Sequence, residues 1–343
     1  MKILHAMAGD AVGGAETFFV DAVEALDETN VQQRVITRAN NDHKIGVIKG
    51  RGIPLETASF NKTFKFPTAA KIKKQIKEFQ PDIVHHWMGR AGMFSQAGDH
   101  VNIGWYGGYY KPSRFVNCEY HVAVTQDIVD HIVKNGVPAD KAFLLHIYAE
   151  FDQGTPIDRA EFDTPDDAPL LLALARLHEK KGLDVLLESL VNVPDAYLWI
   201  AGAGPIEQQL KQQMKDLKLE DRVRFLGWRN DRENLLATCD IVAFPSRYEP
   251  FGAVVIEAWG TGKPLVTAKA AGPKAYVKNE ENGLIVEIDD VPALTEALNR
   301  MIKDTDLQKH VIENGMKAYQ EGFTREVFKK NVLELYSHVL SQK

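Results

Sequence analysis

Two glutamates separated by seven residues lie in one short segment of the second half of the chain. Glu249 lies in the turn "RYEPFG", and Glu257 follows inside the apolar run "AVVIEAWG". A carboxylate among apolar side chains costs several kcal/mol unless it is hydrogen-bonded. The two adjacent hydroxyls of a ribose would supply the missing donors. A helix-capping or surface glutamate is the alternative that this local pattern leaves open.

Two cations precede the glutamates, with four residues between them. Arg176 ends a predicted strand, and Lys181 comes just before Gly182 and the predicted helix "LDVLLESL". Cations at a strand end near a helix start can neutralise a diphosphate and stabilise it as it leaves. Alone, this spacing also fits a solvated charged turn. The expected position on the same sheet edge as the two glutamates favours a binding site.

Two pairs of glycines follow predicted strands. Gly202 and Gly204 occur in "WIAGAGP", and Gly13 and Gly14 occur in "GDAVGGAE". Glycine allows a ligand to approach the backbone closely. Neither pair has the G-x-G-x-x-G spacing that opens a dinucleotide-binding helix, so a dinucleotide-dependent oxidoreductase is poorly supported.

Short β-rich runs alternate with helical patterns along almost the whole chain. This alternation predicts βαβ units and parallel sheets, which is an α/β fold. The predicted strands of the first half are Lys2–Met7, Val35–Thr37, Leu55–Ala58, Asp82–His85, Val101–Tyr106, His121–Thr125 and Ala142–Ile147. Those of the second half are Leu170–Ala175, Tyr197–Ala201, Arg222–Leu226, Ile241–Phe244, Leu265–Ala268 and Leu284–Glu287.

The pattern divides the chain into two doubly wound domains. Residues 1–150 form the first domain and residues 169–322 the second, joined by a linker at 151–168 that is rich in acidic residues and proline. Residues 323–343 form a terminal helix, which we expect to pack back toward the first domain. The carboxyl ends of the strands in two such domains would face a cleft, where ligands of these sheets bind.

Composition and charge exclude several classes of protein. The 343 residues carry a net charge of −6, and residues 1–150 hold 17 Lys and Arg against 16 Asp and Glu. This balance argues against a nucleic-acid binder. Cys118 and Cys239 lie far apart in the sequence, which predicts neither a disulfide framework nor a cysteine metal site.

The N-terminal segment and the lengths of the apolar runs predict a cytoplasmic protein. No apolar run approaches the roughly 20 residues of a membrane span, and the first residues lack a signal-peptide pattern. A periplasmic-type binding protein would share the bilobal architecture. It would normally need an export signal, however, and Met1 leads directly into the first predicted strand.

The motifs together resemble the retaining GT-B glycosyltransferases of family 4 (group 1), over nearly the whole chain. The matching pieces are "VGGAE", "PDIVHHW", "KNGVPADKAFLL", "ARLHEKKGLDVLLESL", "LWIAGAGP", "DRVRFLGW", "PSRYEPFGAVVIEAWGTGKPLV" and "ENGLIV". The resemblance implies two Rossmann-like domains, with the acceptor on the first and a nucleotide-sugar donor on the second. It also implies a hexosyltransferase-type enzyme that needs neither a metal nor another cofactor. UDP is the first expectation for the nucleotide.

The resemblance also implies roles for individual residues. Glu257 would bind the ribose hydroxyls, Arg176 and Lys181 the diphosphate, and Glu249 the donor sugar. Arg176, Lys181 and Glu249 are thus the expected catalytic groups. The remaining donor contacts are expected from Gly14, Gly204, Gly227, Trp228, Arg229, Phe251, Gly252 and Ala253. A catalytically silent GT-B scaffold that binds nucleotide sugars is the alternative, although these charged residues are all present.

The first domain departs from the family pattern where many relatives place a histidine. Here the chain reads "GWYGGYYKP", a departure that resembles a subset of bacterial family members linked to lipopolysaccharide and other surface glycans. Tyr106, Tyr109 and Tyr110 could stack on a glycan or lipid-linked acceptor, or could simply pack in the core. His85, His86 and Trp87 are further acceptor candidates, with a core role as the alternative.

A lysine-rich segment in the first domain could face a membrane. Residues 60–81 hold six lysines, and Lys71, Lys73, Lys74 and Lys77 lie off the apolar face of a predicted helix. The alternative is a helix that covers the sheet and exposes a solvated lysine face. Phe60, Phe64 and Phe66 beside lysines resemble an interfacial segment, which suggests a peripheral protein on an anionic membrane surface.

Overall fold

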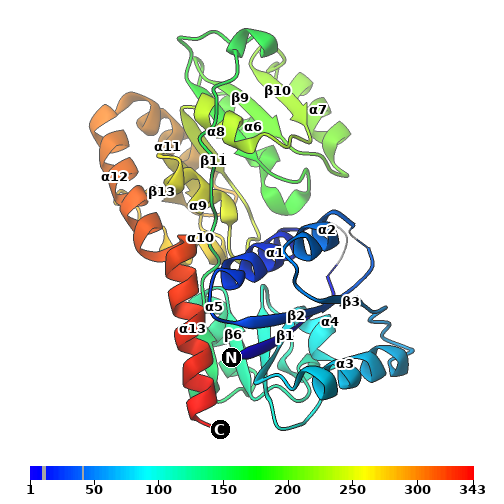
Figure 1. Cartoon of the computed structure of the whole chain (residues 1–343). Helices are drawn as coiled ribbons and strands as arrows, with labels where there is room; N and C mark the ends of the chain where they lie inside the picture. Colours follow the sequence, from blue (N-terminus) through cyan, green and yellow to red (C-terminus); the bar gives the residue numbers. More distant parts are fainter. Residues whose placement is uncertain (10–12, 41) are drawn as a thin grey trace. The chain divides into compact units, whose positions relative to one another are not determined.

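The chain folds into two compact units, each built on one sheet (Figure 1). The computed structural model describes residues 1–9, 13–40 and 42–343. Unit 1 comprises Met1–Tyr148 and Arg325–Lys343, and unit 2 comprises Ala149–Thr324. Part of the predicted glycine loop, Asp10–Val12, lies outside the described residues.

Unit 1 contains a parallel sheet of seven strands among the described residues, in the order β3-β2-β1-β4-β5-β6-β7. The chain reverses its direction of travel across the sheet between β1 and β4, which is where ligands of such sheets bind. The strands are β1 (Lys2–Met7), β2 (Gln32–Thr37), β3 (Leu55–Thr57), β4 (Ile83–Trp87), β5 (Val101–Tyr106), β6 (Tyr120–Ala123) and β7 (Ala142–Leu144).

Helices connect these strands, and the last helix of the chain joins them. The helices of unit 1 are α1 (Gly14–Asp27), α2 (Asp42–Gly50), α3 (Phe66–Phe79), α4 (Met88–Gly92), α5 (Gln126–Lys134) and α13 (Arg325–Ser341). The buried stripe of α13 includes Val332, Tyr336 and Val339. The hydroxyl of Tyr336 lies 2.7 Å from Nδ1 of His85 in the central strand β4, so α13 covers the sheet of this unit.

Unit 2 contains a parallel six-stranded sheet in the order β10-β9-β8-β11-β12-β13. The strands are β8 (Leu170–Leu174), β9 (Tyr197–Ala201), β10 (Val223–Gly227), β11 (Ile241–Phe244), β12 (Leu265–Ala268) and β13 (Leu284–Val286). The helices are α6 (Leu183–Leu190), α7 (Glu207–Asp216), α8 (Arg232–Thr238), α9 (Ala253–Gly260), α10 (Ala271–Tyr276), α11 (Val291–Lys303) and α12 (Thr305–Gly322).

The acidic segment 151–168 lies against unit 2. The guanidinium of Arg159, in this segment, lies 3.0 Å from the Asp240 carboxylate. The backbone amide of Ile157 donates to Oγ1 of Thr238 at 2.8 Å. The Phe162 ring packs edge-on against Trp199 in the core strand β9. This segment therefore forms part of the second unit's surface layer, rather than a free connector.

None of the helices in the described ranges combines the length and the apolar character that a membrane crossing requires.

Candidate functional site

The predicted donor residues lie at one edge of the second sheet. Arg176 follows β8, Gly202 and Gly204 follow β9, Gly227 ends β10, and Glu249 follows β11. All strands of this sheet are parallel, so their carboxyl ends meet at the same edge. The fold therefore collects residues that are up to 73 positions apart in the printed sequence, from Arg176 to Glu249.

The turn after β8 and the turn after β11 are hydrogen-bonded to each other. The amides of Arg247 and Tyr248 both donate to the carbonyl of Lys180, at 2.9 and 3.2 Å. Gly182 has φ of +64°, and any side chain there would collide with the carbonyl oxygen of Pro245. The two turns can approach this closely only because Gly182 has no side chain.

This contact brings Lys181 and Glu249 together. Lys181 Nζ lies 2.5 Å from Glu249 Oε2, and the two side chains are 24% and 15% exposed. The ion pair is accessible from solvent, so a ligand can reach both groups. Arg176 is exposed, and no carboxylate of the described residues pairs with it.

Glu257 is buried inside α9, where it is only 6% exposed. Burial raises the pKa of its carboxyl, the nearby Arg232 opposes that rise, and Glu233 adds to it. Arg232 Nη1 donates to Glu257 Oε1 at 3.0 Å. The sequence did not predict a role for Arg232. Its position at the start of α8, just beyond the "LGWRND" turn, is the feature that could have suggested one.

The turn before α9 is held by unit 2's own backbone and a half-buried tyrosine. Gly252 has φ of +94°, a conformation that favours glycine. The amide of Gly272 donates to the Glu249 carbonyl at 2.8 Å, and the Tyr276 hydroxyl donates to the Phe251 carbonyl. Ala253 is the first residue of α9. The backbone from Glu249 to Ala253 is thus fixed at the sheet edge.

The remaining predicted donor residues of unit 2 lie in the turn that follows β9, at the end of β10 and in the turn after it. A side chain at Gly204 would collide with the backbone of Leu177, so Gly204 allows the loops after β8 and β9 to pack together. Gly227 has φ of +68°, and Trp228 beyond it is 66% exposed. Arg229 binds both carboxylate oxygens of Asp231, at 2.8 and 2.6 Å. This turn therefore presents a rigid backbone and an exposed indole.

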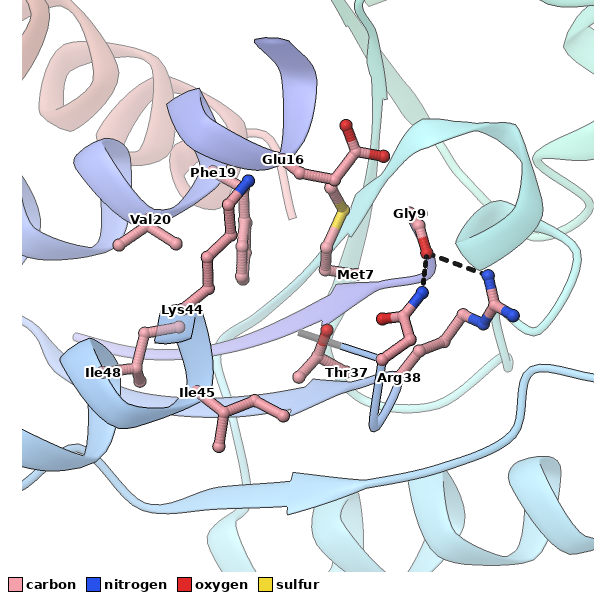
Figure 2. Close-up of a pocket in the computed structure, with 11 residues that line it drawn as sticks. Met7, Gly9, Glu16, Phe19, Val20, Thr37, Arg38, Lys44, Ile45 and Ile48 are labelled. Carbon is pink, nitrogen blue, oxygen red and sulfur yellow. Dashed lines mark hydrogen bonds between the residues drawn. The ribbon is translucent and has the colours of Figure 1, made fainter. Parts of the chain in front are cut away.

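The carboxyl edge of the first sheet carries three cavities. The smallest, about 20 Å³, lies between α1, α2 and the ends of β1 and β2 (Figure 2). Arg38 and Asn40 both donate to the Gly9 carbonyl, at 3.0 and 3.2 Å. The Glu16 carboxylate packs so closely against Gly9 and Gly13 that a side chain at either position would require Glu16 to move. Gly14 begins α1 with open space around its Cα, as a backbone contact to a ligand requires.

Two larger cavities flank the smallest one. One of about 550 Å³ is lined by Arg38, Thr57, Ser59, Thr68 and Lys71, among others. Another of about 130 Å³ is lined by Tyr110 and by the loops after β1, β4 and β5. The hydroxyl of Tyr109 donates to the Asp127 carboxylate. Tyr109 and Tyr110 are half-buried, so they remain acceptor candidates.

The prediction that His85, His86, Trp87 and Tyr106 contact an acceptor is wrong. His85, His86 and Tyr106 have no exposed surface, and Trp87 is 1% exposed. They lie in β4 and β5, which are covered on both faces. His86 Nε2 lies 2.9 Å from Asn102 Oδ1, and the Tyr106 hydroxyl lies 2.9 Å from His121 Nδ1. These side chains form a polar core.

The phenylalanines and lysines of the lysine-rich segment differ in their exposure and in their partners. Phe60 is buried at 1% exposure against Phe94, which corrects its expected interfacial position. Phe64 and Phe66 are 74% and 82% exposed. Lys73 and Lys77 are exposed on α3, while Lys71 pairs with Glu56 and Lys74 with Glu78, at 3.6 and 3.8 Å.

In the part of the chain that the structure describes, no three His, Cys, Asp or Glu side chains are grouped so as to hold a metal ion.

Comparison with known proteins agrees with this arrangement. The family model described as Glycosyl transferases group 1 matches residues 155–318, and that of Glycosyltransferase Family 4 matches residues 12–146. The lipopolysaccharide core biosynthesis glycosyltransferases LpsE and LpsD of Rhizobium meliloti are 30% and 29% identical. The LpsE alignment covers 98% of each chain, and the LpsD alignment covers 100% of each.

A solved structure shows the same fold. Anabaena HepE in complex with UDP superposes with a TM-score of 0.87 at 23% identity, over 98% of this chain and 100% of that one.

Proposed function

Because the chain belongs to the group 1, family 4 glycosyltransferases and has the GT-B fold, we propose that it transfers a sugar from a UDP-sugar to a glycan or lipid-linked acceptor. The product would be lipopolysaccharide or another surface polysaccharide. The proposal follows the role of LpsE and LpsD in lipopolysaccharide core biosynthesis, since both align over nearly their full length. UDP as the nucleotide is supported by its presence in the HepE complex.

The contact between Lys181 and Glu249 carries the donor-site proposal. These residues come from two separate motifs, yet their side chains meet at 2.5 Å at the carboxyl edge of the second sheet. A donor diphosphate would draw the lysine toward its oxygens and release the carboxylate to accept hydrogen bonds from the sugar. Arg176 supplies a second cation after β8, and no described carboxylate pairs with it. Together the two cations would neutralise the leaving group.

Glu257 serves the other end of the nucleotide. Its burial in α9 leaves a carboxylate whose described partner, Arg232, engages Oε1. A ribose diol would donate two hydrogen bonds to this carboxylate and compensate its burial. Trp228 and the backbone of Gly227 and Arg229 would support the base.

We assign the reaction a retaining, front-face course that needs no metal. The bond between the anomeric carbon and the leaving phosphate oxygen breaks as the acceptor oxygen bonds to the same face. The acceptor proton passes to the departing phosphate. The protein contributes positioning and stabilisation of negative charge. Arg176 and Lys181 support metal independence, because they supply the positive charge that a divalent cation would otherwise supply.

We also propose that unit 1 rests on an anionic membrane surface through the segment at 60–81. Phe64 and Phe66 are exposed beside Lys62 and Lys65, which suits insertion of rings among lipid headgroups. A protein that modifies a lipid-linked glycan gains access to its acceptor in this way.

A nucleotide-sugar screen tests the enzymatic proposal. Thermal shift and donor hydrolysis are measured with UDP-, GDP- and ADP-sugars, with and without EDTA. We expect stabilisation and slow hydrolysis with a UDP-sugar, unchanged by EDTA. An absence of stabilisation by all nucleotides would reject the donor site, and a strict metal requirement would reject the mechanism.

Co-sedimentation with vesicles containing phosphatidylglycerol tests the membrane proposal. Replacing Phe64 and Phe66 by Ser should reduce binding, and salt should weaken binding of the unaltered protein. The matched control is Val116→Ser, which removes another exposed apolar side chain of the same unit. Equal binding by all three proteins would reject the proposal.

A further inference from the structure

The cavity of about 130 Å³ in unit 1 has an unusually basic lining. It lies at the carboxyl edge of the sheet, between the loops that follow β1, β4 and β5. Lys62, Arg90 and Arg114 contribute three cations to its wall, and none of its described lining residues is acidic. Three like charges around one cavity repel each other unless an anion joins them.

Two of these cations have no counter-ion among the described residues. No carboxylate of the described residues pairs with Lys62 or Arg114, and both side chains are exposed. The donor edge of unit 2 is different, since Lys181 is paired with Glu249 there. The positive charge of the cavity therefore remains available to a ligand.

The backbone beside the cavity leaves room for the Arg114 side chain. Gly89 opens α4 with Met88, and a side chain on Gly89 would press against Arg114 Cδ at 3.0 Å. Met88 itself has φ of +69°, which a non-glycine residue adopts only at a cost of about 1 kcal/mol or more. Such strain is concentrated at ligand sites. Glycine at 89 lets the Arg114 stem lie across this strained turn beside Tyr110.

The cavity has room for a small anionic group. Its volume of 130 Å³ is roughly ten times the 10–15 Å³ that one water molecule needs on the same measure. A phosphate or carboxylate group with its attached carbon fits this space. Arginine binds both kinds of oxyanion with two parallel hydrogen bonds. The half-buried ring of Tyr110 provides an apolar face for a sugar beside that anion.

We propose that this cavity, with Arg114 and Lys62, binds a phosphate or carboxylate carried by the acceptor saccharide, so that the enzyme selects an acidic acceptor over a neutral one. This inference rests on the proposed function, because it names the chemical class of that function's acceptor. It assigns Arg114 and Lys62 to specificity, and leaves the donor chemistry to unit 2.

Titration calorimetry on the full chain tests the proposal with four probes. Glucose 6-phosphate and galacturonate carry the two oxyanions, glucose is the neutral counterpart, and UDP reports the donor site. We expect at least one acidic sugar to bind tenfold or more tightly than glucose, with an affinity that falls as salt rises. Arg114→Gln and Lys62→Gln should each weaken that binding about tenfold, as expected for loss of a charge-assisted contact.

Lys111→Gln is the matched control, because Lys111 is an exposed cation in the same loop as Arg114 and does not line the cavity. It should leave binding of the acidic sugars unchanged. UDP affinity and donor hydrolysis should also be unchanged in all three variants. The proposal is overturned if glucose binds as tightly as both acidic sugars, or if Lys111→Gln weakens binding as much as Arg114→Gln. If the unaltered protein does not bind UDP, the proposed donor site is rejected instead. Failure of the acceptor proposal and failure of the donor proposal can therefore be distinguished.

Discussion

The two sheets have the same strand order about their first strand but differ in the chemistry of their carboxyl edges. In unit 2 two cations of the edge lie beside a carboxylate, as Lys181–Glu249 and Arg232–Glu257, whereas Arg176 has no carboxylate partner among the described residues. In unit 1, the cavity beside Arg114 collects positive charge without a described acidic lining residue. The same topology therefore carries different charge arrangements at its two carboxyl edges.

The difference follows from what each edge is proposed to bind. A nucleotide sugar presents both hydroxyls and phosphates, so its site needs carboxylates to accept hydrogen bonds and cations to neutralise charge. An oxyanion on an acceptor needs only the cations. Of the four predictions below, three test the charges of the second edge and one tests a difference between the sheet interiors, beginning with the largest expected effect.

Lys181→Ala should lower turnover about 10²- to 10³-fold, the usual effect of removing one group that stabilises transition-state charge. Affinity for UDP should change much less, because the leaving diphosphate gains charge only during the reaction. Turnover and the dissociation constant of UDP are measured separately on the same preparation.

Lys180→Ala is the control for that experiment. Lys180 is the neighbouring lysine, exposed, with its ammonium 4.6 Å from the Tyr248 ring centroid. It should retain most of its turnover. A similar large loss in both variants would show that the general charge of the turn matters, and not the Lys181–Glu249 pair.

The interiors of the sheets differ as well, and acid should separate them. Burial lowers the pKa of His5 and of His86 from 6.5 to about 4, and it lowers that of His85 well below 6.5. The buried polar residues on the strands of unit 2 are confined to Thr267 in the described chain. Unit 1 should therefore be the acid-sensitive unit.

The sign of the effect follows from the depressed pKa values. The native histidines stay neutral while unfolded histidines bind protons below about pH 6.5, so stability is complete above that pH and falls as the pH drops toward 4. A pKa that falls from 6.5 to about 4 corresponds to roughly 3 kcal/mol per histidine. Hydrogen exchange, corrected for intrinsic rates, should show unit 1 losing protection before unit 2. Simultaneous loss in both units would contradict the prediction.

The strand pattern was predictable because buried parallel strands are continuous apolar runs. Lys2–Met7, Val101–Tyr106 and Tyr197–Ala201 were predicted with the bounds that the structure has. The ends of less regular strands were not: β4 reaches Trp87, beyond the predicted end at His85. Polar residues at 85 and 86 suggested a strand end, whereas the structure satisfies His86 with Asn102 inside the core.

The site was predictable only where a motif fixes it. Glu249 and Lys181 belong to motifs, and the structure brings their side chains together. Arg232 and Arg114 belong to none, since an arginine in a polar turn is usually solvated and only the fold brings it to a cavity or a buried carboxylate. For the same reason, sequence could not show that His85 and Trp87 point into covered faces of β4.

Glu257→Ala should weaken UDP binding about 10- to 100-fold, because it removes the acceptor of two hydrogen bonds to a charged group. Turnover at saturating donor should change less than in Lys181→Ala. Calorimetry with UDP measures the effect. Glu281→Ala is the control, since this exposed carboxylate of the same unit forms a surface ion pair with Lys278. Unchanged UDP affinity in Glu257→Ala would show that the ribose is bound elsewhere.

Arg232→Gln should have the smallest effect at neutral pH and the most informative one in acid. Arg232 lowers the pKa of the buried Glu257 carboxyl, which burial raises, so its removal should raise that pKa further. The ionised carboxylate is the form that accepts hydrogen bonds from a diol. UDP affinity should therefore fall only a few-fold at pH 8, in line with a partly exposed ion pair.

As the pH is lowered, the loss of UDP affinity should begin at a higher pH in Arg232→Gln than in the unaltered protein. Glu257→Ala has no such carboxyl and should lack this component of the pH profile. Calorimetry from pH 8 to pH 5 on the three proteins compares them directly. If the profiles of Arg232→Gln and the unaltered protein coincide, Arg232 only packs beside Glu257. A shifted profile would mean that the paired charges of the second edge keep its carboxylate ready for the ribose.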